Sequence, residues 1–452
     1  MGEDNNPHRS ALFTDLYELT MLAAYHAEGL AGTAVFELFF RELPRHRNYV
    51  VAAGLDDVLG YLEHLHFRES DIEWLSGLGL FDRGFLGSLS DFRFTGDIHA
   101  VPEGTVVFPN EPLLQVVAPL PEAQLVETYV LNQMHIQSLA ATKAARIARA
   151  AGGRPVTDFG SRRAHGTDAA IKIARAGYLA GLAGTSNVLA SRLYGIPCMG
   201  TMAHSYVQAH HDELAAFEAF SRSFPATTLL VDTYDTLQGV GHVVELAHRL
   251  GESFHVQAIR LDSGPLEELI PRAREILDAA GLNRVKILAS GGLDEYRLRD
   301  LIGGGAPVDG FGVGTELVVS GDASHVDLSY KLVEYEGEQR MKLSEGKVSL
   351  PGRKQIFREP GGDVLAVHGE SQAGAPLLRK VMRRGRRTDE GRRSLDEIRR
   401  DCMAGLDVLP PRLHALEHAP EGAYPVRVSE ALAQLRSSLT ARLKVMESAP
   451  AR

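Results

Sequence analysis

The sequence predicts an α/β protein that combines a parallel β/α domain with a second, α+β domain. Two observations lead to this prediction. Between about residues 150 and 320, short apolar segments alternate with amphipathic helical stretches, a pattern typical of parallel β/α folds. Before residue 119, helices and short strands follow one another without that alternation, and Pro and Gly interrupt them often. A chain of 452 residues is also long enough for two or three domains.

The N-terminal region predicts an α+β domain over residues 1–118, completed by later strands at about residues 320–360. Leucines at helical spacing predict one amphipathic helix over residues 11–28. The β-branched and aromatic run TAVFELFFREL that follows predicts a strand. Residues 51–90 then indicate interrupted helices, and residues 92–118 indicate short strands broken by Pro and Gly.

Residues 119–319 predict the β/α domain. A long Ala- and Leu-rich helix is expected over residues 123–151, and six strand–helix units follow it. The pattern leaves open whether these units close into a barrel or form an open doubly wound sheet. The predicted strands are Pro155–Phe159, Pro197–Met202, Thr228–Asp232, Val256–Leu261, Val285–Ala289 and Val308–Val313. The predicted helices cover residues 167–182, 185–194, 212–223, 239–250, 265–281 and 294–302.

The C-terminal segment, residues 320–452, combines strands with helices. Three runs that look antiparallel (SHVDLSYKLVEYEG, QRMKLSE and VSLPGRKQIFRE) are separated by predicted turns at Gly337 and Gly346. A helix is predicted over Val426–Val445. The basic stretch Arg379–Arg400 also contains acidic residues, which favours a solvated surface; an anion-binding or RNA-contacting surface is the alternative.

Composition and charge exclude several classes of protein. The net charge of −10 argues against nucleic acid as the main partner, because that binding rests on clustered positive charge. The two cysteines, Cys198 and Cys402, cannot form a disulfide framework or a four-ligand zinc site. No apolar signal segment is present at the N-terminus, and no apolar run reaches the ~18 residues of a membrane span. We therefore expect a cytoplasmic protein without a membrane partner.

Polar residues follow directly after each predicted strand of the β/α domain. The carboxyl ends of parallel strands lie on one face of the sheet, where such folds bind ligands. Six polar clusters in register therefore predict a ligand site on that face. The clusters contain Asp158 and Arg162, Thr201 and His204, Asp232 and Asp235, Arg260 and Asp262, Ser290 and Gly291, and Gly314 and Thr315.

Two of these strand ends are rich in glycine, which suits phosphate. Glycine lets the backbone approach an anion closely, and successive N–H groups then form a nest for phosphate oxygens. Tight turns without a ligand are the alternative. The residues predicted to line the phosphate site are Ser290, Gly291, Gly292, Gly312, Gly314 and Thr315.

A histidine, two arginines and an aspartate at the strand ends are the candidates for chemistry. His204 could act as a base, a metal ligand or a nucleophile, although its neighbouring histidines lack metal-ligand spacing. Arg162 suits phosphate or carboxylate oxygens, or else forms a surface ion pair. Arg260 and Asp262 alternate along one strand, which suits a sugar-phosphate substrate with Mg²⁺, or else makes a buried ion pair.

Several segments together resemble the nicotinate phosphoribosyltransferase family, and the resemblance covers nearly the whole chain in order and spacing. It implies a type II phosphoribosyltransferase fold, with an irregular α/β barrel beside a sandwich-like domain. It also implies a homodimer with shared active sites, each reached by the N-terminal segment of the other subunit. The segments are TDLYELTM (14–21), DFGSRRAHG (158–166), TSNVLASRLYGIPCMGTMAHS (185–205), LLVDTYDT (229–236), IRLDSG (259–264), GFGVGTEL (310–317), and KLVEYEG with MKLS (331–344).

The resemblance implies an enzyme that makes nicotinate mononucleotide and pyrophosphate from nicotinate and phosphoribosyl pyrophosphate. The implied reaction is a glycosyl transfer coupled to ATP hydrolysis, as in a ligase. It would use Mg²⁺ as cofactor and ATP as co-substrate. His204 matches the histidine that ATP phosphorylates, and Arg162 matches an arginine of the active site. Asp262 is expected to bind the ribose hydroxyls or Mg²⁺. The residues matched to nicotinate contacts are Tyr17, Thr201 and Arg260, and Thr315 with its neighbouring glycines matches the phosphate site.

Three other functions compete with this prediction. A nicotinamide phosphoribosyltransferase would share the fold class. A phosphate-binding β/α-barrel lyase or isomerase would need a Schiff-base lysine or a metal cluster at a strand end, whereas Lys286 precedes its strand. A non-catalytic scaffold would lack His204, Arg260 or the glycine loops. The chain departs from the family at Ser161, where an apolar residue is common, and at His165, where Gln is common.

Overall fold

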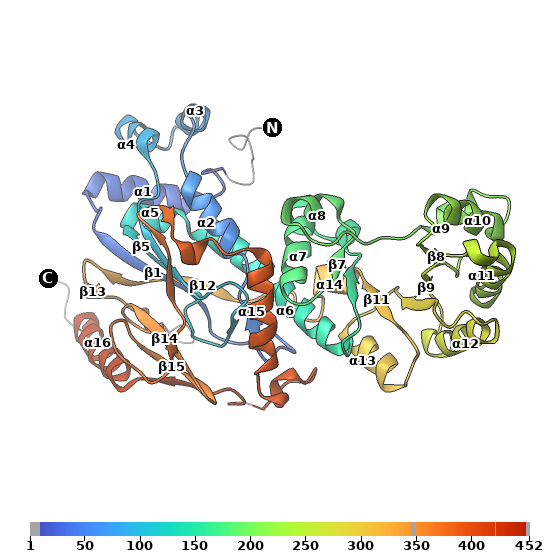
Figure 1. Ribbon diagram of the computed structural model, residues 1–452. Helices are drawn as coiled ribbons and strands as arrows, with labels where there is room; N and C mark the ends of the chain where they lie inside the picture. The colour runs from blue at the N-terminus through green and yellow to red at the C-terminus, as the bar shows by residue number, and fades with distance from the viewer. Residues whose placement is uncertain (1–9, 345–348, 421, 449–452) are drawn as a thin grey trace. The chain divides into compact units, whose positions relative to one another are not determined.

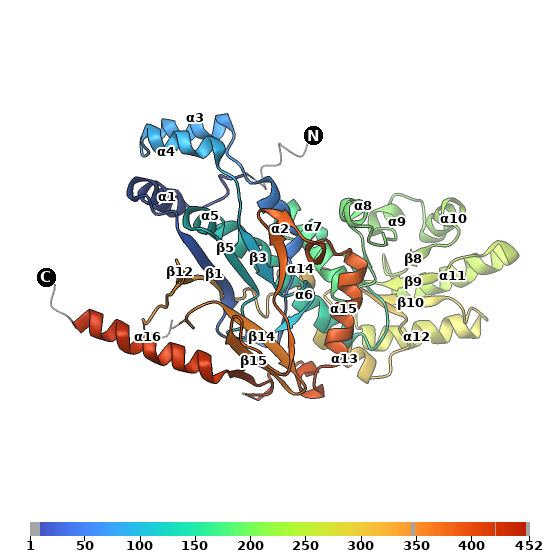
Figure 2. The same ribbon diagram turned by 60° about the vertical axis from the view of Figure 1, so that its left-hand side comes forward.

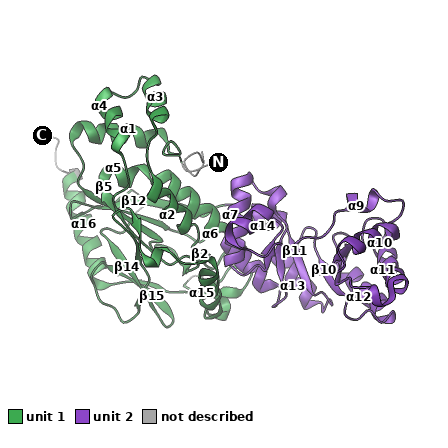
Figure 3. Ribbon diagram, turned by 45° about the horizontal axis from the view of Figure 1, so that its top comes forward, with its two compact units in different colours: residues 1–139, 325–452 green, residues 140–324 purple. Residues whose placement is uncertain are grey.

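The chain forms two compact units that interleave along the sequence. The computed structural model describes residues 10–344, 349–420 and 422–448. One unit contains residues 1–139 and 325–452, and the other contains residues 140–324 (Figure 3). The first is a mixed α+β unit and the second is built on a parallel sheet, which confirms the predicted fold class.

A seven-stranded sheet organises the first unit. Its interior strand β1 (Thr33–Phe40) pairs antiparallel with β5 (Leu114–Pro119) on one side and with β12 (Leu328–Tyr335) on the other. Seven of the eight residues of β1 are buried, so both faces of this strand are covered by other elements. The order is β13-β12-β1-β5-β3-β17-β18, with β3 at Asp97–Ala100, β13 at Glu338–Gln339, β17 at Arg379–Arg383 and β18 at Arg386–Arg387.

A smaller sheet of four strands completes this unit. Its hairpin consists of β14 (Lys354–Glu359) and β15 (Gly362–Val367), flanked by β16 (Ala375–Pro376) and β19 (Val426–Val428). The prediction of a helix from Val426 is wrong at its start, because these three residues pair with β15 and α16 begins only at Glu430. Figure 2 shows α16 beside this hairpin.

Two turns were predicted near the C-terminal strands. Gly337 joins β12 to β13 with a φ of 78°, a left-handed conformation that glycine adopts without strain. The turn predicted at Gly346 lies outside the described residues. A two-stranded ribbon joins β2 (Val50–Val51) to β4 (Val106–Val107).

Helices of the first unit follow the expected order. The predicted N-terminal helix is α1, which ends at Gly29 because that residue takes the left-handed conformation common at helix C-termini. The predicted long helix is α5 followed by α6, and the boundary between the units falls inside α6. The helices are α1 (Leu16–Glu28), α2 (Leu55–His64), α3 (Glu69–Gly77), α4 (Arg83–Ser88), α5 (Leu120–Leu125), α6 (Glu127–Ala150), α15 (Leu395–Asp407) and α16 (Glu430–Ser448).

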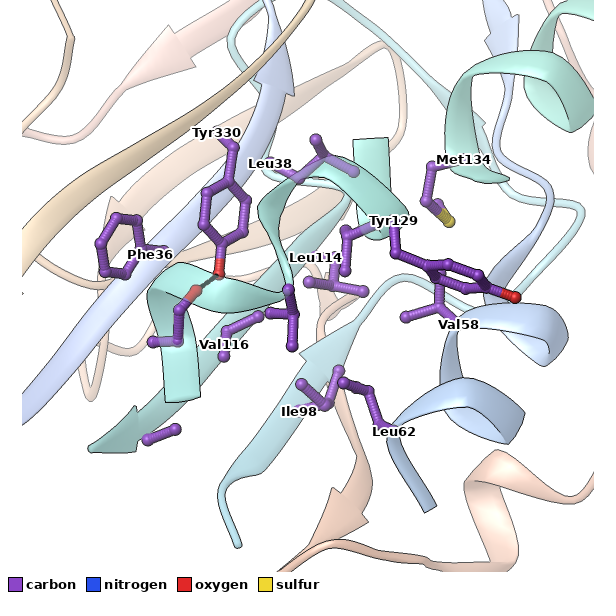
Figure 4. Packing of buried hydrophobic residues seen from close by; sticks show 14 of the residues in the cluster. Phe36, Leu38, Val58, Leu62, Ile98, Leu114, Val116, Tyr129, Met134 and Tyr330 are labelled. Atoms are coloured by element: carbon purple, nitrogen blue, oxygen red, sulfur yellow. Dashed lines mark hydrogen bonds between the residues drawn. The ribbon is translucent and has the colours of Figure 1, made fainter. Parts of the chain in front are cut away.

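Aromatic and aliphatic side chains from strands and helices form the core of this unit (Figure 4). The rings of Phe36 and Tyr330, on neighbouring strands, stack at 4.9 Å. Tyr330 also donates a hydrogen bond to the carbonyl of Ala123 at 2.6 Å, which satisfies its buried hydroxyl. Leu114, fully buried, packs among them from β5. The sheet and the helices of the first unit therefore share one apolar core.

A parallel six-stranded sheet organises the second unit (Figure 1). The order is β7-β6-β11-β10-β9-β8, and every pairing in it is parallel. A single parallel bridge between Thr185 and Cys198 extends it beyond β7. Among the described residues no pairing joins the Cys198 segment to β8, so the barrel is irregular and open there. The strands are β6 (Val156–Asp158), β7 (Gly184–Thr185), β8 (Thr228–Leu230), β9 (Ala258–Leu261), β10 (Lys286–Ala289) and β11 (Gly310–Val313).

Helices alternate with these strands, as the sequence predicts. The strand predicted over Pro197–Met202 is wrong except for the bridge at Cys198, and the sequence analysis missed the short strand β7. Among the helices, α10, α11 and α12 pack side by side. The helices are α7 (Thr167–Leu179), α8 (Val188–Tyr194), α9 (His204–Gln208), α10 (Glu213–Ser223), α11 (Thr236–Leu250), α12 (Leu266–Ala279), α13 (Glu295–Gly303) and α14 (Thr315–Val319).

Candidate active site

Arg260, near the end of β9, is the centre of a polar cluster. Its guanidinium donates to Asp262 Oδ1 at 2.7 Å, to Ser290 Oγ at 2.9 Å and to the carbonyl of Met202 at 3.0 Å. Its Nε is buried and has no hydrogen-bond partner among the described residues. Burial lowers the pKa of Arg260 from its usual value, and the carboxylates of Asp262 and Asp232 oppose that shift. Arg260 therefore keeps its charge and offers one further donor.

Asp262 is held in place by the neighbouring strand end. Its backbone N–H donates to Asp232 Oδ2 at 3.1 Å, and the hydroxyl of Ser263 donates to the same oxygen at 2.5 Å. The other oxygen of Asp232, Oδ1, is buried without a hydrogen-bond partner among the described residues. Asp232 thus fixes the loop after β9, and Asp262 presents a carboxylate that is 30% exposed.

His204 begins α9 and faces this carboxylate. Its Nδ1 lies 3.2 Å from Thr233 Oγ1, and its Nε2 lies 4.0 Å from Asp262 Oδ2. The side chain is 39% exposed, so a ligand can reach it. The hydrogen bond at Nδ1 orients the ring and leaves Nε2 as the nitrogen directed at Asp262.

Thr201 lies in the segment that carries His204. Its hydroxyl is 3.2 Å from the carbonyl of Met202, the same carbonyl that accepts from Arg260. Thr201 is partly exposed and Met202 is buried. The segment is therefore tied to β9 by a side-chain hydrogen bond, although it forms no strand of its own.

Glycine is required where the strand ends approach one another most closely. A Cβ atom on Gly291 would lie 1.7 Å from the carbonyl oxygen of Asp262, and Gly291 has a φ of 88°. A Cβ atom on Gly312 would lie 2.4 Å from the ring of Phe159. Gly292, with a φ of 60°, has open space around its Cα. The loop after β10 therefore passes close to β9 and exposes its backbone at Gly291 and Gly292.

Arg162 belongs to the turn after β6. The turn is held by Asp158, whose buried carboxylate accepts from the N–H of Gly160 at 2.7 Å and from Thr185 Oγ1 at 2.7 Å. Burial raises the pKa of Asp158 above its usual value. The ring of Phe159 lies 5.8 Å from the guanidinium carbon of Arg260. Arg162 itself is exposed, and its positive charge contributes to the lowering of the pKa of Arg260.

The Gly314–Thr315 loop lies beside this turn. A Cβ atom on Gly160 would meet Val318 of α14 at 2.2 Å and the carbonyl oxygen of Gly314 at 2.9 Å. Gly314 is half-buried, whereas Thr315 is exposed at the start of α14. The strand ends of β6, β9, β10 and β11 and the His204 segment are thus brought together, and they carry every predicted site residue of the second unit.

Tyr17, the remaining predicted site residue, belongs to the first unit. It lies in the first turn of α1 and is 46% exposed. Burial of part of its ring raises the pKa of Tyr17 above the usual value, and the nearby carboxylates of Glu127, Glu18 and Asp15 add to the shift. Its phenol therefore stays protonated and already makes hydrogen bonds with the neighbouring carboxylates of Glu18 and Glu127.

Candidate metal ligands are sparse. Within residues 10–344, 349–420 and 422–448, no group of three His, Cys, Asp or Glu side chains has the geometry to hold a metal ion. His210 Nδ1 lies 2.8 Å from the carbonyl of Tyr206, and His211, 97% exposed, lies beside Asp212. Asp262, partly exposed beside the glycine loop, can take part in holding an ion that arrives with phosphate oxygens.

Two contributors to the site were missed by the sequence analysis. The sequence indicates Asp232 only as a polar residue after a strand, and no local pattern points to Thr233. Both belong to the LLVDTYDT segment, which was quoted for the resemblance. The family resemblance of that segment therefore pointed to both residues. Their hydrogen-bond partners lie at other strand ends, so their roles become visible only in the folded structure.

The basic stretch Arg379–Arg400 lies in the first unit and is largely paired. Lys380 contacts Asp97 at 2.6 Å, Arg379 contacts Glu390 at 3.1 Å, and Arg387 contacts Glu63 at 3.0 Å. These ion pairs agree with a solvated structural surface. None of the described helices combines the length and apolar character that crossing a membrane requires.

Comparison with known families matches the chain over most of its length. The matching families are the nicotinate phosphoribosyltransferase (NAPRTase) N-terminal domain over residues 12–135, the nicotinate phosphoribosyltransferase (NAPRTase) family over residues 155–348, and the nicotinate phosphoribosyltransferase C-terminal domain over residues 340–436. Together, the three matches cover residues 12–135 and 155–436.

Individual proteins agree with these matches. A nicotinate phosphoribosyltransferase of Mycobacterium tuberculosis is 58% identical over 443 residues, which cover 96% of each chain. The nicotinate phosphoribosyltransferase of Bacillus subtilis is 41% identical over 375 residues, covering 80% of this chain and 76% of the relative. The crystal structure of human nicotinic acid phosphoribosyltransferase superposes with a TM-score of 0.84 at 30% identity, covering 94% of this chain and 99% of the human chain.

Proposed function

Since the chain belongs to the nicotinate phosphoribosyltransferase family, we propose that it transfers the phosphoribosyl group of phosphoribosyl pyrophosphate to the ring nitrogen of nicotinate. The products are nicotinate mononucleotide and pyrophosphate, in a step of NAD biosynthesis. The observation that supports this function best is the cluster of Arg260, Asp262 and His204 beside glycine loops at the carboxyl ends of parallel strands. Such a cluster combines a site for an anion, a site for a sugar and a nucleophile.

Arg260 supports the choice of nicotinate over nicotinamide. Its buried Nε lacks a hydrogen-bond partner among the described residues, and a substrate carboxylate can accept from it. The neutral amide of nicotinamide carries no charge and cannot make the charge-assisted hydrogen bonds that a carboxylate makes with a guanidinium, so we expect it to bind more weakly. The hydroxyl of Thr201, close to the same guanidinium, can hold the second carboxylate oxygen.

The glycine loops are proposed to hold phosphoribosyl pyrophosphate. Backbone N–H groups at Gly291, Gly292 and Gly314 can approach phosphate oxygens because no side chain intervenes. Ser290, Gly312 and Thr315 complete these loops, and the exposed Arg162 adds positive charge on the same side. Mg²⁺ bound with the pyrophosphate, near Asp262, would supply further neutralisation of the leaving group.

The protein contributes mainly position to the transfer step. The bond between C1 of the ribose and pyrophosphate breaks as the ring nitrogen of nicotinate approaches the other face of C1. Positive charge develops on the sugar, and Asp262 can stabilise it while binding the ribose hydroxyls. Arg260 and Thr201 keep the pyridine ring in line by holding its carboxylate.

His204 is proposed to couple the reaction to ATP. The γ-phosphoryl group of ATP would move to Nε2 with release of ADP, and water would later release phosphate from the histidine. Nε2 is the proposed nucleophile because Nδ1 is engaged with Thr233. In this step Nδ1 carries the ring proton, and the bond from Nε2 to phosphorus makes the ring a cation until that proton leaves. The carboxylate of Asp262, 4.0 Å from Nε2, can stabilise this positive charge.

A homodimer is proposed to complete the site. Tyr17 lies in the first unit with its side chain 46% exposed, so its ring can contact a substrate held by another copy of the chain. A tyrosine ring also offers a face on which the pyridine of nicotinate can stack. Loss of activity on dilution below the dimer's dissociation constant would support this arrangement.

The test of the proposed function is product formation from phosphoribosyl pyrophosphate and Mg²⁺, with nicotinate or nicotinamide, each with and without ATP. We expect nicotinate mononucleotide to form faster with ATP, together with ADP. Turnover of nicotinamide alone would assign the chain to the rival transferase. No product from either base would reject the proposed function.

A further inference from the structure

A buried network of charged side chains lies in the second unit, away from the polar cluster around Arg260. The Nζ of Lys143, in α6, lies 2.6 Å from Glu295 Oε2 and 2.9 Å from Asp322 Oδ1. Arg146, one turn further along α6, donates from its Nε to Glu295 Oε1 at 2.9 Å. The side chains of Lys143 and Glu295 are 1% and 0% exposed. Two cations and two anions thus balance one another inside the protein.

Each anion of this network belongs to a segment that follows a glycine loop. Glu295 is the first residue of α13, three residues after Gly292. Asp322 lies in the turn after α14, the five-residue helix that begins at Thr315. The ammonium group of Lys143 therefore contacts both segments that follow the proposed phosphate loops in the chain.

The loop after β10 is consequently fixed at both of its ends. At the first end, the hydroxyl of Ser290 contacts Arg260 and Asp262. At the other end, Glu295 contacts Lys143 and Arg146. Gly291 and Gly292 lie between these two anchors and have positive φ angles. A loop without side chains needs such anchors if its N–H groups are to keep one geometry.

Stability alone does not explain the use of charges at this place. Removing two charges from water costs free energy that their attraction only partly returns, and apolar side chains of similar size often stabilise a fold as well. Charged groups differ from apolar groups because their hydrogen bonds fix the distance and direction between the two partners. Each hydrogen of an ammonium group needs an acceptor at a defined position. The network is thus suited to holding two loops in register.

We propose that Lys143 is a positioning residue that sets the two glycine loops for the phosphate groups of phosphoribosyl pyrophosphate. The inference rests on the proposed function of those loops and extends it to a residue that does not touch the substrate. Nicotinate is proposed to bind Arg260 and Thr201, which lie outside these loops and are linked to the loop after β10 through Ser290, the anchor that does not involve Lys143. Loss of Lys143 should therefore affect the two substrates unequally.

The experiment compares Lys143→Met and Asp322→Asn with the wild-type chain, measuring KM for each substrate and kcat. A shift of a loop by about 1 Å is sufficient for large effects, so we expect KM for phosphoribosyl pyrophosphate to rise roughly tenfold or more in Lys143→Met. KM for nicotinate should stay within about twofold of wild type. Asp322→Asn, which changes only one of the two links, should give a smaller change in the same direction.

Lys354→Met serves as the matched control. Lys354 makes a comparable buried ion pair in the first unit, 2.6 Å from Glu37, with side chains 3% and 1% exposed. Its loss should lower the unfolding temperature as much as Lys143→Met does, without separating the two KM values. If Lys143→Met does not fold, the KM values of Asp322→Asn test the inference instead. Asp322 is 21% exposed, so water can hydrate the amide and the variant should fold.

The outcomes distinguish this inference from the proposed function. Parallel changes of both KM values, or no change in folded variants, would overturn the positioning role of Lys143. A wild-type chain that forms no product and binds no phosphoribosyl pyrophosphate would overturn the proposed function, and the inference with it. A selective rise in KM for phosphoribosyl pyrophosphate supports both.

Discussion

The two units use their sheets differently. In the first unit, β1 is eight residues long with seven of them buried, and aromatic rings pack against it from neighbouring strands. In the second unit, the strands are only two to four residues long, and polar side chains begin where they end. The first sheet is thus mainly a packing surface. The second holds separate polar groups near one another, so mutations in the two units should separate stability from activity.

The largest expected effect is the loss of ATP hydrolysis in His204→Ala. The substitution removes the proposed phosphoryl acceptor, so ADP formation should fall to background while a weak ATP-independent transfer remains. Because the side chain is 39% exposed, the unfolding temperature should hardly change. The measurements are ADP release, nicotinate mononucleotide formation and circular dichroism. Loss of both activities together with the folded spectrum would contradict the role of His204.

Arg260→Ala should also act on activity, by about a hundredfold. Removing this guanidinium takes away the proposed carboxylate partner and leaves Asp262 without its main donor, a loss of about 3 kcal/mol in transition-state binding. The measurement is kcat/KM for nicotinate. Arg249→Ala, an arginine 51% exposed on α11, is the control and should retain the wild-type value. Equal activity in both variants would show that Arg260 is only a structural ion pair.

Leu114→Ala tests the first unit, where the effect should be on stability. Leu114 is fully buried in the core, and shortening such a side chain typically costs about 2–5 kcal/mol. Urea unfolding followed by circular dichroism gives the change in the free energy of unfolding. The activity per folded molecule should remain close to that of the wild type. If the variant were as stable as the wild type but inactive, the proposal that the first unit serves stability and the second serves activity would be wrong.

The smallest expected effect is on the pH dependence of stability, through Glu18 in α1. Burial raises the pKa of Glu18 from its usual value of 4.5 to about 8, although hydrogen bonds from Thr128 oppose the shift. The folded state therefore binds a proton more tightly than the unfolded chain does. This stabilisation is complete below about pH 4.5 and is lost as the pH rises through about 8.

Glu18→Gln should remove that pH dependence, because the amide does not ionise. Between about pH 6 and about pH 9, the unfolding temperature of the wild type should fall by roughly 2–4 °C more than that of the variant. Differential scanning calorimetry at several pH values measures the difference. Parallel curves for the two proteins would mean that Glu18 is ionised throughout this range.

The sequence predicted most strands of the second unit because apolar runs there are bounded by polar loops. The strand predicted over Val285–Ala289 differs from β10 by one residue at its start. The two-residue β7 is too short to produce a recognisable pattern. The segment Pro197–Met202 looks like a strand in composition, but it makes only one bridge because β8 does not pair with it. Whether these segments form strands therefore depends on pairing across the sheet rather than on local composition.

The candidate site was predictable in its residue types but not in its connections. Arg260 and Asp262 could be placed at one strand end from sequence spacing alone. The link from Asp232 to the backbone of Asp262, and the link from Lys143 to two separate loops, join residues that are far apart in the chain. No local pattern contains that information, since each link depends on which strands become neighbours.

The pairing of β1 with β12 sets an order of events during synthesis. The end of β1 is separated from the start of β12 by 287 residues (41–327), and these include all of the second unit. At a translation rate of about 5–20 residues per second, one edge of β1 waits roughly 15–60 s for its partner. The β5 edge can pair much sooner, and residues 140–324 can fold in the meantime as a contiguous insertion. A newly made chain therefore carries an apolar, unpaired strand edge, and we expect it to depend on chaperones until β12 arrives.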